Sequence, residues 1–278
     1  MGVLLLSGLA RAEETAKPPA PDSAAPFQLA DLTGDRLFRG GLVYTHAWDK
    51  GDEGSIEVFA LRLGLQLAVA RVVVVYGLLP LAYVRGDGDE QFDPGNLTVG
   101  GRWVHHQPGL HAGAGAAIGL PTSPDFNLFG GDSGAAAYVA TIIQFDRSAD
   151  FYPNVTSYQL AGDVRVERGD VFCQVEVGYL HLTHPDADEG LDLVHADIGA
   201  GVRVSPTTSL LAELTTISLV LEDEGFYNNQ NWFHSLYAGA RHSTDRASIG
   251  AYVFFPFDGP YSDEVNAVGV GVDVAAPL

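Results

Sequence analysis

The sequence predicts an all-β fold: a transmembrane, antiparallel, up-and-down β-barrel of about 12 strands, with short periplasmic turns and long acidic extracellular loops. Three observations carry this prediction. Apolar residues alternate with glycine, polar or charged residues along most of the chain, which is the period of a β-strand. The alternating segments exceed the roughly five or six residues usual in soluble sheets, and they suffice for the roughly 9–11 residues of a tilted bilayer-crossing strand. Short and long connections alternate between them.

The predicted strands share this alternation and are, in chain order, 37–48, 56–69, 71–84, 95–106, 109–120, 155–166, 170–182, 191–204, 207–220, 232–243, 246–256 and 264–274. In 56–69, for example, Phe59 and Leu61 alternate with Arg62 and Gly64. A closed sheet satisfies every backbone N–H and C=O group, which lipid cannot do. We therefore expect the apolar face to meet lipid and the glycine-rich, charged face to line the lumen.

The connections set the order and the number of the strands. The short ones are Ala70-Arg71, Gln107-Pro108, Arg168-Gly169, Pro206 and Thr244-Asp245, and the long ones are 49–55, 85–94, 121–154, 183–190, 221–231 and 257–263. A further strand-like stretch, 135–145, would give an odd number of strands and break this order, whereas single-chain bacterial barrels have even numbers. We therefore place it inside 121–154, interpreted as a long external loop with a helical or folded-in segment.

The N-terminal region predicts export. Residues 1–12, "MGVLLLSGLARA", resemble the apolar core and A-x-A cleavage site of a signal peptide, although a basic start is lacking. Residues 13–36 are rich in proline and alanine and predict a periplasmic tether, and residues 37–278 are the predicted barrel. The expected location is the bacterial outer membrane. The expected partners are outer-membrane lipid and lipopolysaccharide, the barrel-assembly machinery and a small-molecule solute.

Charge and cysteine content narrow the classes of function. The chain has 35 acidic and 15 basic residues and a formal net charge of −20, which argues against nucleic-acid binding. The single cysteine, Cys173, cannot form an internal disulfide. No cofactor and no catalytic residue is predicted.

Charged and imidazole side chains are expected on the lumen face, along a transport path. They are Arg62, Arg102, His106, His111, Asp163, Arg165, Glu176, His195, Asp197, Arg203, Glu213 and Arg241, and Arg39, Gln66, Gln159, Gln174, Tyr237 and Asp273 share this face. Two interpretations stay open. The side chains form a structural network that fills a narrow lumen, because buried charges need partners, or they form an electrostatic filter along a solute path.

The segment 71–84 is apolar on both faces. Val74, Leu78 and Pro80 are expected to form an apolar stripe in the lumen. The stripe either packs against a folded-in segment such as 135–145 or guides hydrophobic solutes. Pro80 lacks an N–H for the ladder, so it is expected to mark a bulge or a lateral weak point in the wall.

The long loops carry much of the acidic charge. In "DADEGLD", Asp186, Asp188 and Asp192 have the alternation of a calcium loop, but the closing glutamate is missing. A solvated acidic loop is the simpler interpretation, and divalent cations bridging to lipopolysaccharide are the second. No other metal site is predicted.

The segment from Leu61 to Ser123 resembles an outer-membrane channel family labelled for the meta-pathway of phenol degradation. The matches are 81–84, the acidic loop 86–95, Gly95-Asn96-Leu97 with 100–103, and Leu120-Pro121-Thr122. Ser123 stands where the family has glycine, and Leu278 stands where such barrels often end in an aromatic residue. The resemblance implies an outer-membrane barrel that passes small hydrophobic or aromatic compounds.

The predicted function is therefore passive uptake of small, hydrophobic or aromatic solutes through an outer-membrane channel. The alternative is a structural or adhesive barrel with a plugged lumen and no transport. An enzyme is a weaker rival, because the adjacent His234 and Ser235 fall on opposite faces of a strand, which is wrong for a nucleophile and its base. A soluble secreted β-domain is a further rival.

Overall fold

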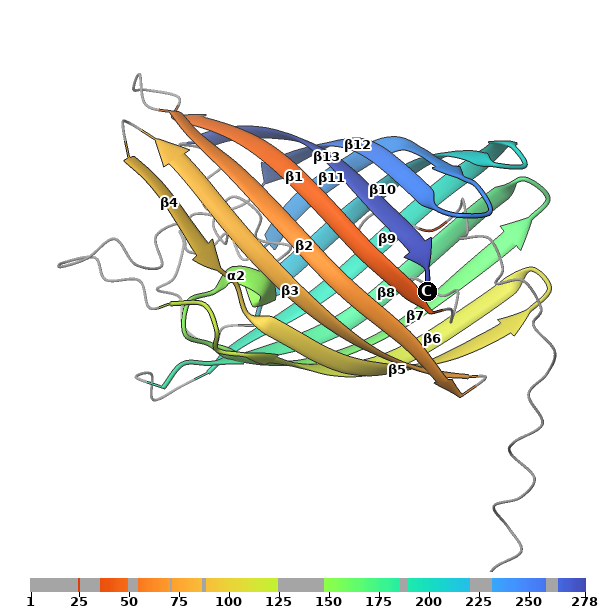
Figure 1. Ribbon diagram of the computed structural model, residues 1–278, viewed down its shortest axis with the longest axis horizontal. Helices are drawn as coiled ribbons and strands as arrows, with labels where there is room; N and C mark the ends of the chain where they lie inside the picture. The colour runs from red at the N-terminus through yellow and green to blue at the C-terminus, as the bar shows by residue number, and fades with distance from the viewer. Residues whose placement is uncertain are drawn as a thin grey trace, which may run out of the picture.

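The computed structural model shows a closed antiparallel β-barrel (Figure 1). It describes residues 25, 36–49, 55–70, 72–86, 89–124, 148–185, 190–220, 232–258 and 265–278. The strands are β1 (Leu37–Asp49), β2 (Ser55–Ala70), β3 (Val73–Gly86), β4 (Asp89–Pro94), β5 (Leu97–Gln107), β6 (Leu110–Leu120), β7 (Thr156–Arg168), β8 (Val171–Thr183), β9 (Leu191–Ser205), β10 (Thr208–Leu219), β11 (Trp232–Ser243), β12 (Ser248–Asp258) and β13 (Val265–Pro277). A short helix, α2 (Ser148–Phe151), follows the long connection after β6.

Each strand pairs with its neighbours in the sequence, and β1 pairs with both β2 and β13, which closes the ring. The 13 strand segments make 12 barrel strands, because β4 and β5 are successive parts of one strand that runs beside β3. The predicted fold class and strand number are confirmed. Every predicted strand segment is present, with its ends shifted by a few residues.

One predicted loop is partly wrong. The segment 85–94, expected as a long loop, contains β4, which pairs with residues 81–86 of β3. The acidic residues of this segment obscure the alternation of apolar and polar side chains that marks a strand. Only the pairing with β3 therefore identifies β4. The strand-like stretch 135–145 lies outside the described residues.

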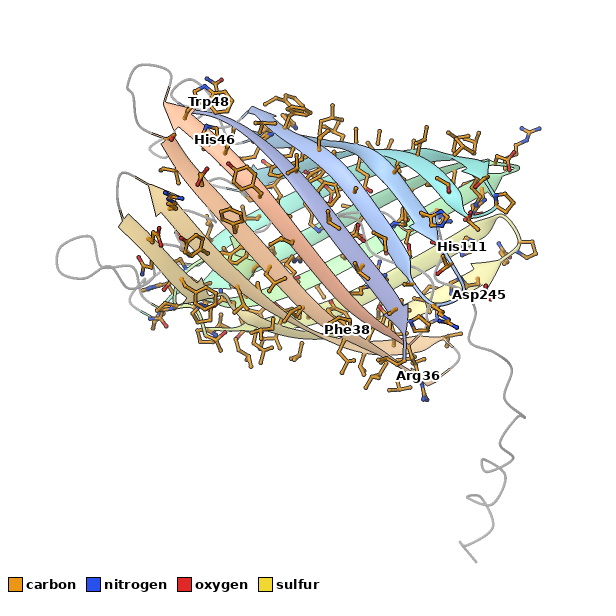
Figure 2. All side chains as sticks on the ribbon, turned by 45° about the horizontal axis from the view of Figure 1, so that its top comes forward. Arg36, Phe38, His46, Trp48, His111 and Asp245 are labelled. Carbon is orange, nitrogen blue, oxygen red and sulfur yellow. The ribbon has the colours of Figure 1, made fainter. Side chains whose placement is uncertain are left out.

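The tight turns lie at one end of the barrel. Gly109 and Gly169 have φ values of 75° and 61°, in the left-handed region that favours glycine at a turn. His111 and Asp245 lie toward the same end as Arg36, whereas His46 and Trp48 lie at the other end (Figure 2). The two ends therefore differ as the predicted topology requires, with tight turns at one and longer connections at the other.

The outer face is an apolar belt. Large apolar side chains that alternate with inward polar ones are exposed, among them Leu42, Leu65, Val164, Val175, Ile198, Leu210, Val253, Val270 and Val272. Tyr44, Phe59 and Tyr83 pack against one another in tilted pairs across three neighbouring strands on this face, with ring centroids 4.9 and 5.8 Å apart. Phe233, near the start of β11, packs on the inside. Among the described residues, no helix is long and apolar enough to cross a membrane.

The helix α2 lies inside the ring of strands. Phe151 is fully buried in a cluster that includes Val43 of β1, Ala82 of β3 and Tyr237 of β11. The expectation of a folded-in helical segment within 121–154 is thus met at 148–151. The interior of the barrel at this level is filled by side chains from the wall and from the helix.

The two ends of the barrel can be told apart in intact cells. A tag inserted in 186–189, between β8 and β9, is expected to be labelled from outside, whereas a tag at Asp245, in the tight turn between β11 and β12, is expected to be protected. Labelling of permeabilised cells controls for tag exposure. Labelling at Asp245 alone in intact cells would reverse the topology.

The two faces of the wall should differ in their tolerance of charge. Leu63→Arg, on the outer face of β2, is expected to cost about 2–4 kcal/mol near the bilayer midplane. Gln159→Arg, on the inner face of β7 at the edge of the lumen cavity, should cost much less. Reversible folding into lipid vesicles measures both, and equal losses would contradict the assigned faces.

Candidate functional site

A cavity of about 380 Å³ occupies the barrel lumen. Of the predicted lumen residues, it is lined by Arg62, Arg102, Glu176, His195, Asp197, Arg241, Val74 and Leu78, together with Arg39, Gln66, Gln159 and Asp273. Glu213 also faces inward but is buried at 1% exposure and does not line the cavity. The alternation along each strand thus brings side chains from distant parts of the sequence to one shared cavity.

One wall of the cavity is rich in arginine. Arg39 on β1, Arg62 on β2 and Arg241 on β11 line it together. The Arg241 guanidinium lies 2.6 Å from Asp273 Oδ2 on β13, and Arg62 Nε lies 2.8 Å from Asp150 Oδ2 on α2. These ion pairs provide the buried guanidinium groups with the partners that burial requires.

The opposite side of the lumen is rich in carboxylates, of which Glu176 and Asp197 line the cavity and Asp163 is buried beside them. Asp163 on β7, Glu176 on β8 and Asp197 on β9 are direct cross-strand neighbours, because Glu176 is in register with both of the others. Arg102 of β5 contacts Asp163, and its Nη2 lies 3.9 Å from Glu176 Oε2. In the order of strands round the ring, β8 stands six strands from β1 in either direction, so Glu176 and Arg39 lie on opposite sides of the lumen.

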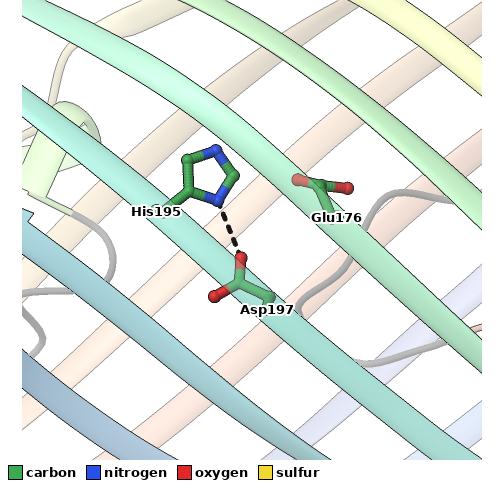
Figure 3. Close-up of side chains that lie close together, drawn as sticks. All are labelled: Glu176, His195 and Asp197. Carbon is green, nitrogen blue, oxygen red and sulfur yellow. Dashed lines mark hydrogen bonds and ion pairs between the residues drawn. The ribbon is translucent and has the colours of Figure 1, made fainter.

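His195 continues the carboxylate row. Its Nδ1 lies 2.8 Å from Asp197 Oδ2, and Glu176 lies beside the pair (Figure 3). The backbone N–H of Thr216 on β10 donates to the other carboxylate oxygen of Asp197, at 3.0 Å. Asp197 is therefore oriented from both sides.

A second polar cluster lies near the tight turns. Glu167 contacts three cations or potential cations: Arg165, Arg203 at 2.8 Å and His111 at 3.5 Å. The Nδ1 atoms of His106 and His111 are 2.8 Å apart. The guanidinium groups of Arg165 and Arg203 also lie over the ring of Phe172, at 5.1 and 5.7 Å from its centroid. These predicted lumen residues are brought together, but away from the cavity.

The predicted apolar stripe is split. Val74 and Leu78 line the cavity with Tyr76 between them, so a hydroxyl interrupts the apolar surface. Pro80 is buried at the level where β3 changes its partner, from β5 over 73–78 to β4 over 81–86. A break in the wall at Pro80 matches its lack of an N–H donor.

The motifs that carry the family resemblance anchor α2 at this break. The side chain of Asn96 is fully buried and donates to the carbonyl oxygens of Ala149 and Tyr152, at 3.2 and 2.8 Å. The backbone N–H of Asn96 donates to Asp150 O at 2.6 Å. At Gly95, a Cβ would lie 2.3 Å from the same Asp150 oxygen, so only glycine lets the helix approach this closely.

The second motif completes the anchor. Thr122 Oγ1 donates to Gly95 O at 2.6 Å and accepts from the N–H of Leu97 at 2.8 Å. The N–H of Ser123 donates to Asn96 Oδ1 at 3.1 Å. The residues around Asn96 and Thr122 thus hold together the interrupted strand, the end of β6 and the helix.

The weak metal candidate in the acidic loop is not assembled among the described residues. Asp192 lies on the outer face of β9, where it accepts from the Tyr179 hydroxyl at 2.5 Å and lies 2.6 Å from His181 Nδ1. Asp186 and Asp188 lie outside the described residues.

Sequence reasoning missed Asp150 and Tyr76 as cavity residues. Asp150 sits in a four-residue helix inside the longest connection, where no periodic pattern marks an inward side. Tyr76 has the inward alternation of Val74 and Leu78, and this signal could have found it.

Comparison with known proteins supports the fold. A solved outer membrane channel from Pseudomonas putida F1 is similar, with a TM-score of 0.61 and 13% identity over 95% of this chain and 99% of that chain. The beta domain of the Bordetella autotransporter Brka has a TM-score of 0.51 and 14% identity, over 88% of this chain and 100% of that one. No protein-family model and no curated protein matches the sequence.

At these identities the likeness shows the fold alone. The transport unit of the autotransporter AIDA-I from Escherichia coli has a TM-score of 0.50 and 12% identity, over 90% of this chain and 93% of that one. The closed barrel, its apolar belt and these outer-membrane neighbours place the protein in the bacterial outer membrane.

The ion pair between Arg102 and Asp163 should matter more than an exposed one. Asp163→Asn removes a carboxylate that is fully buried and is expected to lower the free energy of unfolding by about 3 kcal/mol, because a buried guanidinium loses its partner. In the control, Glu90→Gln removes the partner of Arg85 in a pair whose side chains are 62% and 58% exposed, and should cost under about 1 kcal/mol. Similar losses in a refolding titration would contradict the buried role of Asp163.

Proposed function

We propose that the protein is a passive channel for small solutes across the outer membrane. The observation that carries this proposal is the cavity inside a closed barrel, lined by charged side chains of both signs and by part of an apolar stripe. Small-molecule sites typically combine apolar surface with a few placed polar groups. Passage through such a space needs no covalent chemistry, so we propose a non-enzymatic role.

The proposed solutes are small and partly apolar, with aromatic compounds as the class implied by the family resemblance. Val74 and Leu78 offer apolar contact, while Tyr76 and Arg102 offer hydrogen-bond donors on the same side of the cavity. A phenolic or carboxylated aromatic compound matches this combination. The transverse arrangement of arginines and carboxylates supports selection by charge.

The alternative, a structural or adhesive barrel with a plugged lumen, is favoured by a specific observation. The helix α2 is tied to the wall by Asn96 and by the Arg62–Asp150 ion pair, and Phe151 fills the interior beside it. A permanently docked helix would block passage at this level. The two functions therefore differ in whether α2 limits the flow of solute.

Phe151→Ala tests this difference. The change removes the buried anchor of α2 and is expected to weaken its docking by about 3–5 kcal/mol, which should raise single-channel conductance in planar bilayers and solute entry in vesicle swelling. Tyr158→Ala, a change on the exposed outer face, is the control and should leave conductance unchanged. Conductance near zero in both wild type and Phe151→Ala would support the structural barrel.

A further inference from the structure

The row of neighbouring carboxylates on β7, β8 and β9 requires positive charge beside it. Asp163, Glu176 and Asp197 lie directly opposite one another on three adjacent strands. Like charges in directly opposed positions destabilise a sheet. Arg102 contacts Asp163 at one end of the row, and His195 lies at the other end, beside Asp197. The Arg102 end of the row has a permanent cation. The imidazole of His195, at the other end, can be either a cation or, when neutral, a metal ligand.

The surroundings of His195 have the features of a metal site. Ligand atoms of Glu176, His195 and Asp197 all lie within 4.8 Å of one another. Gly178 is in register with His195, and a Cβ at Gly178 would lie 1.8 Å from His195 Nε2. The imidazole therefore occupies a space that exists only because residue 178 is glycine, and this space is beside Glu176 on the same strand.

The third ligand is fixed by the backbone. The pairing of β9 with β10 is interrupted at residues 196 and 197, since it runs through Ile198 with Leu214 and resumes at His195 with Ile217. In this gap the Thr216 N–H donates to the side chain of Asp197 instead of to a ladder carbonyl. Hydrogen bonds of this kind to a ligating carboxylate orient it and raise metal affinity.

We propose that Glu176, His195 and Asp197 bind a divalent first-row transition-metal ion, with Zn²⁺ as the probe. One imidazole and two carboxylates are a donor set that suits Zn²⁺, and three protein ligands leave a coordination position open toward the lumen. Two donors on one tetrahedral Zn²⁺ lie about 3.3 Å apart. His195 Nδ1 and Asp197 Oδ2 are 2.8 Å apart and all three ligands lie within 4.8 Å, so small side-chain rotations of all three residues would bring them to this spacing. The ion neutralises the row at the end that Arg102 does not reach.

This site goes beyond the proposed channel and does not depend on it. Binding is measured on the purified, folded barrel stripped of metal by chelation, by titration calorimetry with ZnCl₂ in excess MgCl₂. The magnesium competes with Zn²⁺ for sites made of oxygen ligands alone, such as acidic loops, but not for a site with an imidazole ligand, which Mg²⁺ does not favour. Heat-modifiable gel migration verifies that each variant is folded.

The expected result is a single high-affinity Zn²⁺ per barrel that His195→Gln weakens at least tenfold. Asp197→Asn, which keeps an acceptor oxygen for Thr216, should weaken it similarly. His181→Gln is the matched control, since His181 also lies against an aspartate but on the outer face, and it should leave the affinity unchanged. X-ray absorption at the zinc edge should show one imidazole ligand in the wild type and none in His195→Gln.

Two outcomes overturn the proposal. One is equal Zn²⁺ affinity in wild type and folded His195→Gln. The other is a loss in His181→Gln as large as in His195→Gln. Neither outcome bears on solute passage, which the conductance of the Phe151→Ala variant tests separately.

Discussion

The whole structure depends on the inability of lipid to hydrogen-bond the backbone. Every N–H and C=O group in the membrane needs a partner in the protein, and a sheet meets this need only by closing on itself. Here the pairing of β1 with both β13 and β2 completes the ring. Closure then gives each strand one face in lipid and one in the lumen, so the alternation of apolar and polar residues has a physical cause at every position.

The same closure forces polar side chains into a confined interior, where each charge needs a partner. Arg241 pairs with Asp273, Arg102 with Asp163, and Arg203 with Glu167. In each pair the two residues lie on strands that are separated by one other strand in the ring, so the pairs brace the wall. A network of this kind is compatible both with selective passage of solute and with a filled lumen. The two cases differ in whether the docked helix α2 leaves a path for solute.

The helix depends on an interruption in the wall. Between β4 and β5 the chain leaves the strand at Gly95 and Asn96, and the freed Asn96 side chain and N–H bind α2. The backbone groups that the ladder loses at this point are thus used to hold a segment far away in the sequence. The sequence motifs around Gly95 and Asn96 therefore serve to anchor α2. Through α2 they also affect the path of any solute that moves through the lumen.

The sequence by itself determined the barrel, its strand number and the face of most side chains in the predicted strands. These follow from the strand period of two, which is a property of local backbone geometry and needs no knowledge of neighbours. Arg62, Glu176 and Arg241 are therefore inward in both the sequence and the structure. The short strand β4 and the inward helix α2 carry no such local pattern, because they are stabilised by partners that the sequence does not place beside them.

Only the tertiary structure decided which inward residues meet. Alternation assigns Asp163, Glu176 and Asp197 to one face, but their adjacency depends on the register between strands, and a slip of one residue would turn a whole strand over. The inward residues separate into the lumen cavity and the cluster around Glu167 according to the position of each residue along the barrel axis. Strand register and position along the barrel axis are set by the turns and by long-range pairing around the closed ring. The site, unlike the fold, therefore depends on contacts between residues that are distant in the chain.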